Sequence, residues 1–239
     1  MFEELSHFRH EHKYVEPQIN LIGMQLRLSH IMQIDSHVSE KGYYCIRSLY
    51  FDDFHNRYLK ENINGVDERV KWRIRIYDRN SSHIFLERKI RKGDLIAKQS
   101  CRISTDMFNC ITRHNVGISS ENPRLLNLFI KEIKITALRP TVIVEYERTP
   151  FVCAEGNTRV TIDRNIRSSD EVDAFLEDRK LMSRPVLSSG HGLIEVKYDA
   201  FLPDYVAHTI EHGRMRRETF SKYYLACRFP YNGITAVRY

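Results

Sequence analysis

Basic residues recur at every second position in one stretch of the chain. Between residues 69 and 77 they alternate with apolar residues, the basic set being Arg69, Lys71, Arg73 and Arg75. Because successive side chains of a strand point to opposite faces, this spacing places all four cations on one face. Arginine forks and lysine ammonium groups bind phosphate oxygens by charge-assisted hydrogen bonds, so such a face fits a strongly anionic ligand.

The pattern repeats on other predicted strands. At least four strands or strand ends carry cations opposite apolar neighbours: Arg73, Arg75, Lys89, Lys98, Arg148 and Arg159. For any single strand, a solvated sheet face is the better explanation of such alternation. Repetition over several strands favours another arrangement, in which the strands close into a ring and direct the cations into a polar lumen.

Glu195 lies among these cations, on the same predicted strand face as Lys197. A carboxylate in this setting either holds Mg²⁺ or Mn²⁺ against phosphate oxygens or forms a salt bridge with a neighbouring cation. The spacing favours neither interpretation. The same two alternatives apply to four further glutamates, Glu11, Glu87, Glu145 and Glu147.

Several other sites are disfavoured by the sequence. His7, His10 and His12 have the spacing of metal ligands, but no cysteine or carboxylate cluster accompanies them, so packing roles are favoured. The chain has no GxxxxGK[ST], GxGxxG or GxSxG motif, so any phosphate chemistry would depend on side chains. Aromatic residues do not alternate with the basic residues as they do in surfaces that bind single-stranded nucleic acid. Nucleic acid is therefore only the second candidate for the anionic partner, and we do not expect it to bind.

The composition predicts an ordinary soluble globular protein. With 239 residues, 42% of them hydrophobic, and a net charge of +6, we expect one domain spanning residues 1–239 and an anionic partner. Five cysteines without a CxxC pair argue against a disulfide framework. No basic leader or long apolar stretch is present, so we expect a cytoplasmic protein.

Hydrophobic periodicity and turn signals predict an α+β chain dominated by antiparallel strands. The expected strands are 8–16, 43–51, 69–77, 83–90, 141–148, 159–163 and 193–198. Helices are expected over 19–34, 53–62, 105–115 and 123–134, from Pro203 to a stop at Gly213, and over 219–227.

Eight segments, in this order along the chain, resemble a known family. They are 9–14 (RHEHKY), 46–52 (IRSLYFD), 71–77 (KWRIRIY), 86–89 (LERK), 144–148 (VEYER), 159–163 (RVTID), 194–198 (IEVKY) and 221–223 (SKY). Together they resemble the VTC domain, the polyphosphate polymerase branch of the CYTH-like triphosphate tunnel metalloenzymes. The resemblance covers nearly the whole chain.

This resemblance implies a closed eight-stranded antiparallel tunnel barrel with a basic lumen and helices packed outside. It further implies that the lumen binds ATP and inorganic polyphosphate together with Mn²⁺ or Mg²⁺. By motif position, the catalytic residues would be Arg73, Arg75, Lys89 and Lys222, and the metal ligand Glu195. The other phosphate-binding residues would be Lys13, Lys98, Arg148, Arg159 and Lys197, with Asp163 in a supporting position.

The function implied is transfer of the γ-phosphoryl group of ATP to the end of a polyphosphate chain. In phosphoryl transfer, positioning and electrostatic stabilisation supply most of the catalysis, so no nucleophilic side chain is predicted. Two alternatives remain: a triphosphatase or polyphosphatase that uses water as acceptor, and a non-catalytic polyphosphate-binding module. A separately encoded membrane protein is a further expected partner, which would hold the chain at the inner face of a membrane.

Overall fold

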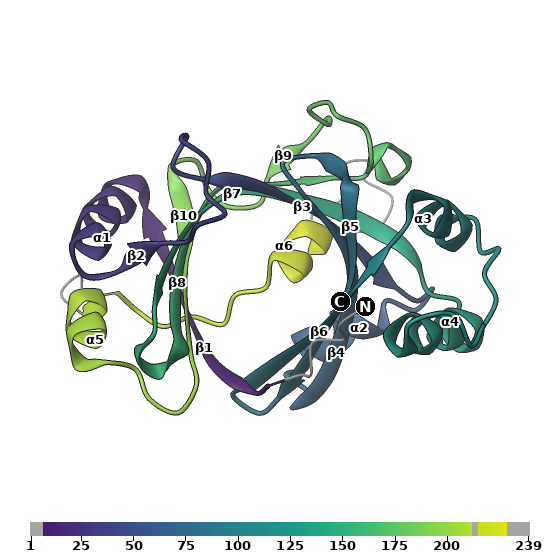
Figure 1. Ribbon diagram of the computed structural model, residues 1–239, viewed down its shortest axis with the longest axis horizontal. Coiled ribbons are helices and arrows are strands. Elements are labelled where there is room, and N and C mark those ends of the chain that lie inside the picture. The colour runs from purple at the N-terminus through teal and green to yellow at the C-terminus, as the bar shows by residue number, and fades with distance from the viewer. Residues whose placement is uncertain (1–6, 212–214, 229–239) are drawn as a thin grey trace.

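The computed structural model describes residues 7–211 and 215–228. Eight strands pair in the order β7-β3-β4-β5-β6-β1-β10-β8, and β8 pairs back with β7, so the sheet closes into a ring (Figure 1). Every pair is antiparallel. The prediction of a closed eight-stranded antiparallel fold is confirmed. The ring strands are β1 (Arg9–Pro17), β3 (Tyr44–Asp52), β4 (Glu68–Tyr77), β5 (Asn80–Lys92), β6 (Leu95–Ile103), β7 (Arg139–Cys153), β8 (Thr158–Ser169) and β10 (His191–Tyr198).

Two short strands extend the sheet beyond the ring. β2 (Gln33–Ile34) pairs with β7, and β9 (Arg184–Pro185) pairs with β8. Between β4 and β5 the chain turns at Asp78 and Arg79, which have φ angles of 48° and 56°. This two-residue connection is shorter than the gap between the expected strands 69–77 and 83–90, and two left-handed residues match the twist of the flanking strands.

The hydrophobic core lies outside the ring, between the strands and the helices. On β4, Trp72, Ile74 and Ile76 point away from the lumen and are fully buried. Trp72 packs against Phe129 of α4 (Arg124–Thr136), with ring centroids 4.8 Å apart. Figure 1 shows α3 (Thr105–Thr112) beside α4 on one side of the ring. Helices therefore cover the apolar outer face of the ring on this side.

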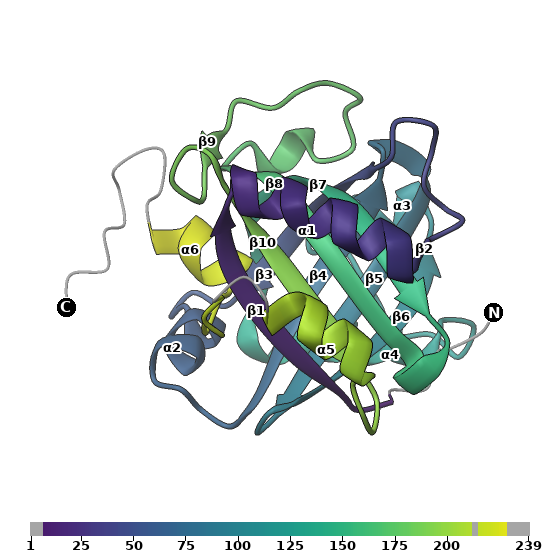
Figure 2. The same ribbon diagram turned by 90° about the vertical axis from the view of Figure 1, so that its left-hand side faces the viewer.

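The opposite side of the ring is covered by α1 (Gln18–Ile31) and α5 (Asp204–Glu211) (Figure 2). α1 buries Leu21, Met24 and Leu28, which recur at helical spacing, against the outer faces of β8 and β10. The predicted helix from Pro203 is present as α5, and its predicted stop, Gly213, lies outside the described residues. At α3, the Ser104 side chain caps the helix by accepting a hydrogen bond from Met107 N.

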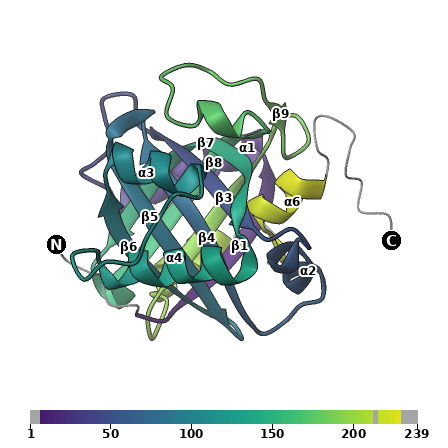
Figure 3. The ribbon, with the colours of Figure 1, turned by 90° about the vertical axis from the view of Figure 1, so that its right-hand side faces the viewer.

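One helix does not lie on the outer wall. α6 (Lys222–Arg228) lies beside α2 (Arg57–Ile63) at one end of the ring, and Figures 1, 2 and 3 agree on this position. It contacts β7, β8 and α2, and it buries Lys222, Tyr223 and Ala226. α6 therefore closes the end of the lumen rather than covering the outside. Among residues 7–211 and 215–228, no helix is both long and apolar enough to span a bilayer.

Candidate functional site

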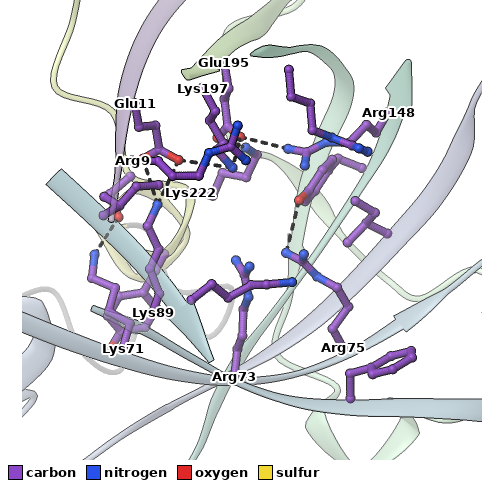
Figure 4. A pocket seen from close by; sticks show the side chains of 18 of the residues that line it. Arg9, Glu11, Lys71, Arg73, Arg75, Lys89, Arg148, Glu195, Lys197 and Lys222 are labelled. Carbon is purple, nitrogen blue, oxygen red and sulfur yellow. Dashed lines mark hydrogen bonds and ion pairs between the residues drawn. The ribbon is translucent and has the colours of Figure 1, made fainter. Parts of the chain in front are cut away.

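The ring encloses a cavity of about 890 Å³. All ten residues that the sequence predicted for the site line this cavity, and they come from seven strands of the ring and from α6. Figure 4 labels seven of them, and the side chains of these seven are directed toward a shared central space: Arg73, Arg75, Lys89, Arg148, Glu195, Lys197 and Lys222. The ten residues are Lys13, Arg73, Arg75, Lys89, Lys98, Arg148, Arg159, Glu195, Lys197 and Lys222.

The strand register explains why the charges meet. Lys71, Lys89 and Lys98 lie opposite one another on β4, β5 and β6. On the other wall, Lys13 of β1 lies opposite Glu195 of β10. A register shift of one residue in any of these strands would have turned its charged residues toward the helices, so closure and register together create the basic lumen.

Glu195 is ion-paired on both carboxylate oxygens. Its Oε1 accepts a hydrogen bond from Lys222 Nζ at 2.9 Å, and its Oε2 accepts one from Arg148 Nη2 at 2.9 Å. Burial acts to raise the pKa of Glu195, but Lys222, Lys197 and Arg148 outweigh burial and hold this pKa well below its ordinary value. Glu195 is therefore a carboxylate anion that faces the cavity.

Glu11 is a second carboxylate in the cavity. From the sequence it could either hold a metal ion or form a salt bridge. Its oxygens lie 2.8 Å from Lys89 Nζ, 3.1 Å from Lys13 Nζ and 3.3 Å from Lys197 Nζ. Burial opposes ionisation here too, yet the pKa of Glu11 lies well below its ordinary value because these three lysines surround it. The alternation of Arg9, Glu11 and Lys13 was the sequence signal for this position.

Glu87 forms salt bridges with predicted phosphate-binding cations. Its carboxylate lies 2.7 Å from Arg73 Nη2, 3.5 Å from Arg75 Nη1 and 3.3 Å from Lys98 Nζ. Burial raises the pKa of Glu87, and the two arginines and the lysine lower it by more. Of the other two glutamates, Glu145 binds Arg47 and Arg79 on the outer face, and Glu147 accepts a hydrogen bond from Asn165.

Asp163 holds two of the predicted residues in place. It is fully buried, and it binds Arg148 through Nε at 2.6 Å and through Nη2 at 2.7 Å. Lys222 Nζ lies 2.7 Å from the same carboxylate. Arg159 is oriented separately, by Asp35 and by the hydroxyl of Tyr44. The buried carboxylate of Asp163 therefore fixes Arg148 and Lys222 at the wall of the cavity.

Lys71 is a cavity residue that the sequence placed on the cationic face but did not assign to the site. Its Nζ donates hydrogen bonds to Asn62 Oδ1 at 2.7 Å and to Ser221 Oγ at 3.0 Å. Both acceptors are neutral. Burial, reinforced by repulsion from Lys13 and Arg69, lowers the pKa of Lys71 to about 7.

The donor set of the cavity fits a hard divalent cation. Within residues 7–211 and 215–228, no three or more histidine, cysteine or carboxylate side chains form a metal-binding group. The cavity offers Glu11 and Glu195, whose oxygens are the ligand type that Mg²⁺ and Mn²⁺ prefer, and such ions are held by one or two carboxylates plus substrate phosphates.

Solved structures with the same fold are known. A proposed adenylyl cyclase from Hippeastrum with a dominant triphosphatase activity aligns with a TM-score of 0.55 and 14% identity, covering 92% of this chain and 95% of that one. A proposed adenylate cyclase from Bacillus halodurans gives 0.54 and 11%, covering 90% and 95%. One from Vibrio parahaemolyticus gives 0.51 and 11%, covering 92% and 98%. The chain therefore shares the fold of these three proteins.

The family is shown by the sequence itself. The VTC domain profile matches residues 8–231, which is nearly the whole chain, so the chain belongs to the VTC domain family. No curated protein sequence matches it.

Proposed function

We propose that the protein is a polyphosphate polymerase, which transfers the γ-phosphoryl group of ATP to the end of an inorganic polyphosphate chain. The observation that carries this proposal is the enclosed cavity, in which cations from seven strands and α6 face one another. Membership of the VTC domain family supports the same activity. A tunnel lined along its length by cations suits a ligand whose charge also repeats along its length.

In the proposed reaction, a terminal oxygen of polyphosphate attacks the γ-phosphorus of ATP. The bond from that phosphorus to the β,γ-bridging oxygen breaks, ADP leaves with the bonding electron pair, and the chain gains one phosphate. Arg73, Arg75, Lys89 and Lys222 would bind the reacting phosphates and stabilise the charge on their oxygens. Lys13, Lys98, Arg148, Arg159 and Lys197 would hold the neighbouring phosphates in line.

The carboxylates give these cations partners before substrate binds. Glu87 and Glu11 keep the buried positive groups paired, which avoids the cost of an unpaired buried charge. Phosphate oxygens would then replace carboxylate oxygens around the same guanidinium and ammonium groups. Glu195, together with Glu11, would hold Mn²⁺ or Mg²⁺, which would neutralise part of the phosphate charge.

Hydrolysis is the second candidate. The relative from Hippeastrum has a dominant triphosphatase activity on the same fold. In that case water would take the place of the polyphosphate end as acceptor, and free phosphate would be the product. The cavity residues would have the same roles toward the donor.

The deciding experiment incubates the protein with γ-labelled ATP and Mn²⁺ and resolves the products on a gel. Label in long chains is expected. Free labelled phosphate alone would establish a triphosphatase, and binding of triphosphate without turnover would establish a non-catalytic module. Glu195→Gln should abolish incorporation, whereas Lys131→Met, which removes an exposed charge on α4, should leave it unchanged.

A further inference from the structure

α1 carries apolar side chains on two opposite faces. Its inner face packs on β8 and β10. The outer face has three apolar residues at the same helical spacing, Ile19, Ile22 and Leu26, with exposed fractions of 72%, 45% and 61%. A helix with one face toward water normally places polar residues there. A row of exposed apolar side chains marks a surface that another molecule covers.

α5 lies beside α1 on the same outer wall of the ring (Figures 1 and 2). The two helices run in opposite directions. The chain leaves α1 into β2, which pairs with Val152 near the end of β7. At the start of α5, the hydroxyl of Tyr205 donates a hydrogen bond to Glu155, just beyond the end of β7, at 3.4 Å. The end of α1 is therefore level with the start of α5.

The exposed charges of the two helices have opposite signs. α1 has Arg27 and no aspartate or glutamate, whereas α5 has Asp204 and Glu211 and no lysine or arginine. All three charged side chains are exposed. Within residues 7–211 and 215–228, none of the three forms an ion pair. The wall thus has a basic row on α1 beside an acidic row on α5.

Two copies of this wall are complementary to each other. A two-fold axis that runs along the wall, between the two helices, places α1 of each copy on α5 of the other. Rotation about this axis keeps positions along the helices level, so Arg27 of one copy meets Asp204 of the second. Leu26 then packs against Tyr205 of the second copy, whose side chain is 43% exposed. Every such contact occurs twice in the pair.

We propose that the protein forms a two-fold symmetric dimer through α1 and α5. The dimer does not depend on the proposed function, because these helices lie on the outer wall and leave the ends of the ring uncovered (Figure 1). A bilayer surface fits the wall less well, since its anionic headgroups would repel Asp204 and Glu211. α1 and α5 have 14 and 8 residues, near the low end of the roughly 20–30 residues that each side of a stable interface supplies. The dimer should therefore be reversible, with a Kd of about 1–50 µM.

The test is sedimentation velocity of the full chain over a concentration series from about 1 to 200 µM. The weight-average mass should rise from that of one chain toward that of two. Leu26→Glu should weaken the dimer by about 10-fold or more, because a charge replaces an apolar contact that occurs twice. Ile135→Glu, at an apolar position of α4 that is 69% exposed, is the matched control and should dimerise normally.

Charge reversal tests the pairing of α1 with α5. Arg27→Glu or Asp204→Arg alone should weaken the dimer by about 3-fold or more, since two ion pairs become repulsive. The two substitutions combined in one chain should restore the wild-type affinity, because the reversed pair forms in both halves of the interface. Lys131→Glu, on the outer face of α4, is the charge-reversal control and should have no effect.

Three outcomes would overturn the proposal. The wild-type chain could remain a monomer at the highest concentration. A dimer that Leu26→Glu leaves intact would use another surface of the molecule. If the monomer instead binds vesicles of phosphatidylserine and phosphatidylcholine, and Leu26→Glu abolishes that binding, the wall is a membrane contact and not a dimer interface.

Discussion

The ammonium group of Lys222 lies 2.9 Å from Oε1 of Glu195. Lys222 opens α6, which is not part of the ring, whereas Glu195 lies in the middle of β10. The same ammonium group lies 2.7 Å from Asp163 of β8. α6 is thereby joined to two strands of the tunnel wall by buried ion pairs, and its first residue belongs to the candidate site.

Removing either lumen arginine of β4 should weaken triphosphate binding. We expect Arg73→Ala or Arg75→Ala to lower the affinity for tripolyphosphate by roughly 10- to 100-fold, because each loses charged hydrogen bonds to phosphate. Arg88→Ala is the matched control, since Arg88 lies on the outer face of β5 over Trp72. Calorimetric titration of the three variants measures the difference. Wild-type affinity in both lumen variants would refute the phosphate site.

Glu195→Gln should weaken metal binding while preserving the fold. Glutamine keeps the shape of the side chain but loses the charge that a divalent cation requires. We expect the Mn²⁺ affinity of the complex with the ATP analogue, followed by electron paramagnetic resonance, to fall by about 10-fold or more. Glu147→Gln, on the outside of β7, controls for the substitution and should bind Mn²⁺ normally. Unchanged Mn²⁺ binding in Glu195→Gln would exclude Glu195 as a ligand.

The period of two along the strands was enough to predict which residues of β4 face the lumen, because backbone geometry alone sets that alternation. β6 was not predicted as a strand. The positions that alternate with Lys98 on β6 include the small Ala97 and Cys101, so the apolar half of its alternation is weak. The helix at 219–227 was predicted, but its place across the tunnel end was not, since a local pattern does not say what a helix covers.

The sequence also does not determine which residues pair with the charged side chains. Glu11 could bind a metal ion or pair with a basic side chain. The sequence does not decide between the two because Lys89, which lies 78 residues away in the chain, comes close to Glu11 only when the ring closes. The same holds for Asp52 and Tyr223, which lie 171 residues apart in the chain and form a buried hydrogen bond. Such contacts follow from strand order and register, which single-strand periodicity leaves undetermined.

The binding of polyphosphate should depend on pH through Lys71. Its pKa of about 7 means that its positive charge is lost as the pH rises from 6 to 8. We expect the affinity for long-chain polyphosphate to fall over this range in the wild type more steeply than in Lys71→Met. Titration of the phosphates themselves affects both proteins equally, so the difference between the two slopes reports Lys71. Parallel slopes in the two proteins would show that the charge of Lys71 does not contribute to polyphosphate binding.

The same pKa predicts the effect of Lys71→Met on stability. The folded-state pKa lies below the ordinary value of about 10.4, so the unfolded chain binds the proton more tightly. The buried charge thus costs most below pH 7, and the cost falls as the pH rises from 7 toward 10. Lys71→Met should therefore raise the melting temperature of the unliganded protein more at pH 6 than at pH 9. An equal increase at both pH values would show that packing, not charge, is responsible.

The hydrogen bond from the Tyr223 hydroxyl to Asp52 should hold α6 against α2. Asp52 is fully buried and also accepts hydrogen bonds from the backbone amides of Tyr58 and Leu59 in α2. Tyr223→Phe should cost about 1–3 kcal/mol of unfolding free energy in chemical denaturation, because the carboxylate loses a donor. Tyr224→Phe, the neighbouring position on α6, should cost less than about 0.5 kcal/mol. Equal losses in both variants would mean that this bond does not stabilise α6.

Gly192 lies in β10 at a position where the neighbouring chain leaves no room for a side chain. A β-carbon there would lie 2.6 Å from the backbone oxygen of Asp163 and 2.6 Å from Cδ1 of Leu21, so β8 or α1 would have to shift. Overpacking of this kind costs about 1–3 kcal/mol. Each kcal/mol lowers the melting temperature by about 2–4 °C in a chain of this size, so Gly192→Ala should unfold measurably earlier.

The matched control is Gly117→Ala, because a β-carbon at Gly117 would meet nothing within 4 Å. Its melting temperature should stay within about 2 °C of the wild type. Since the carbonyl that Gly192 approaches belongs to Asp163, Gly192→Ala should also displace the carboxylate that holds Arg148 and Lys222. The affinity for tripolyphosphate should then fall along with the melting temperature. A lower melting temperature with wild-type affinity would show that Asp163 tolerates a shift of β8 without loss of the site.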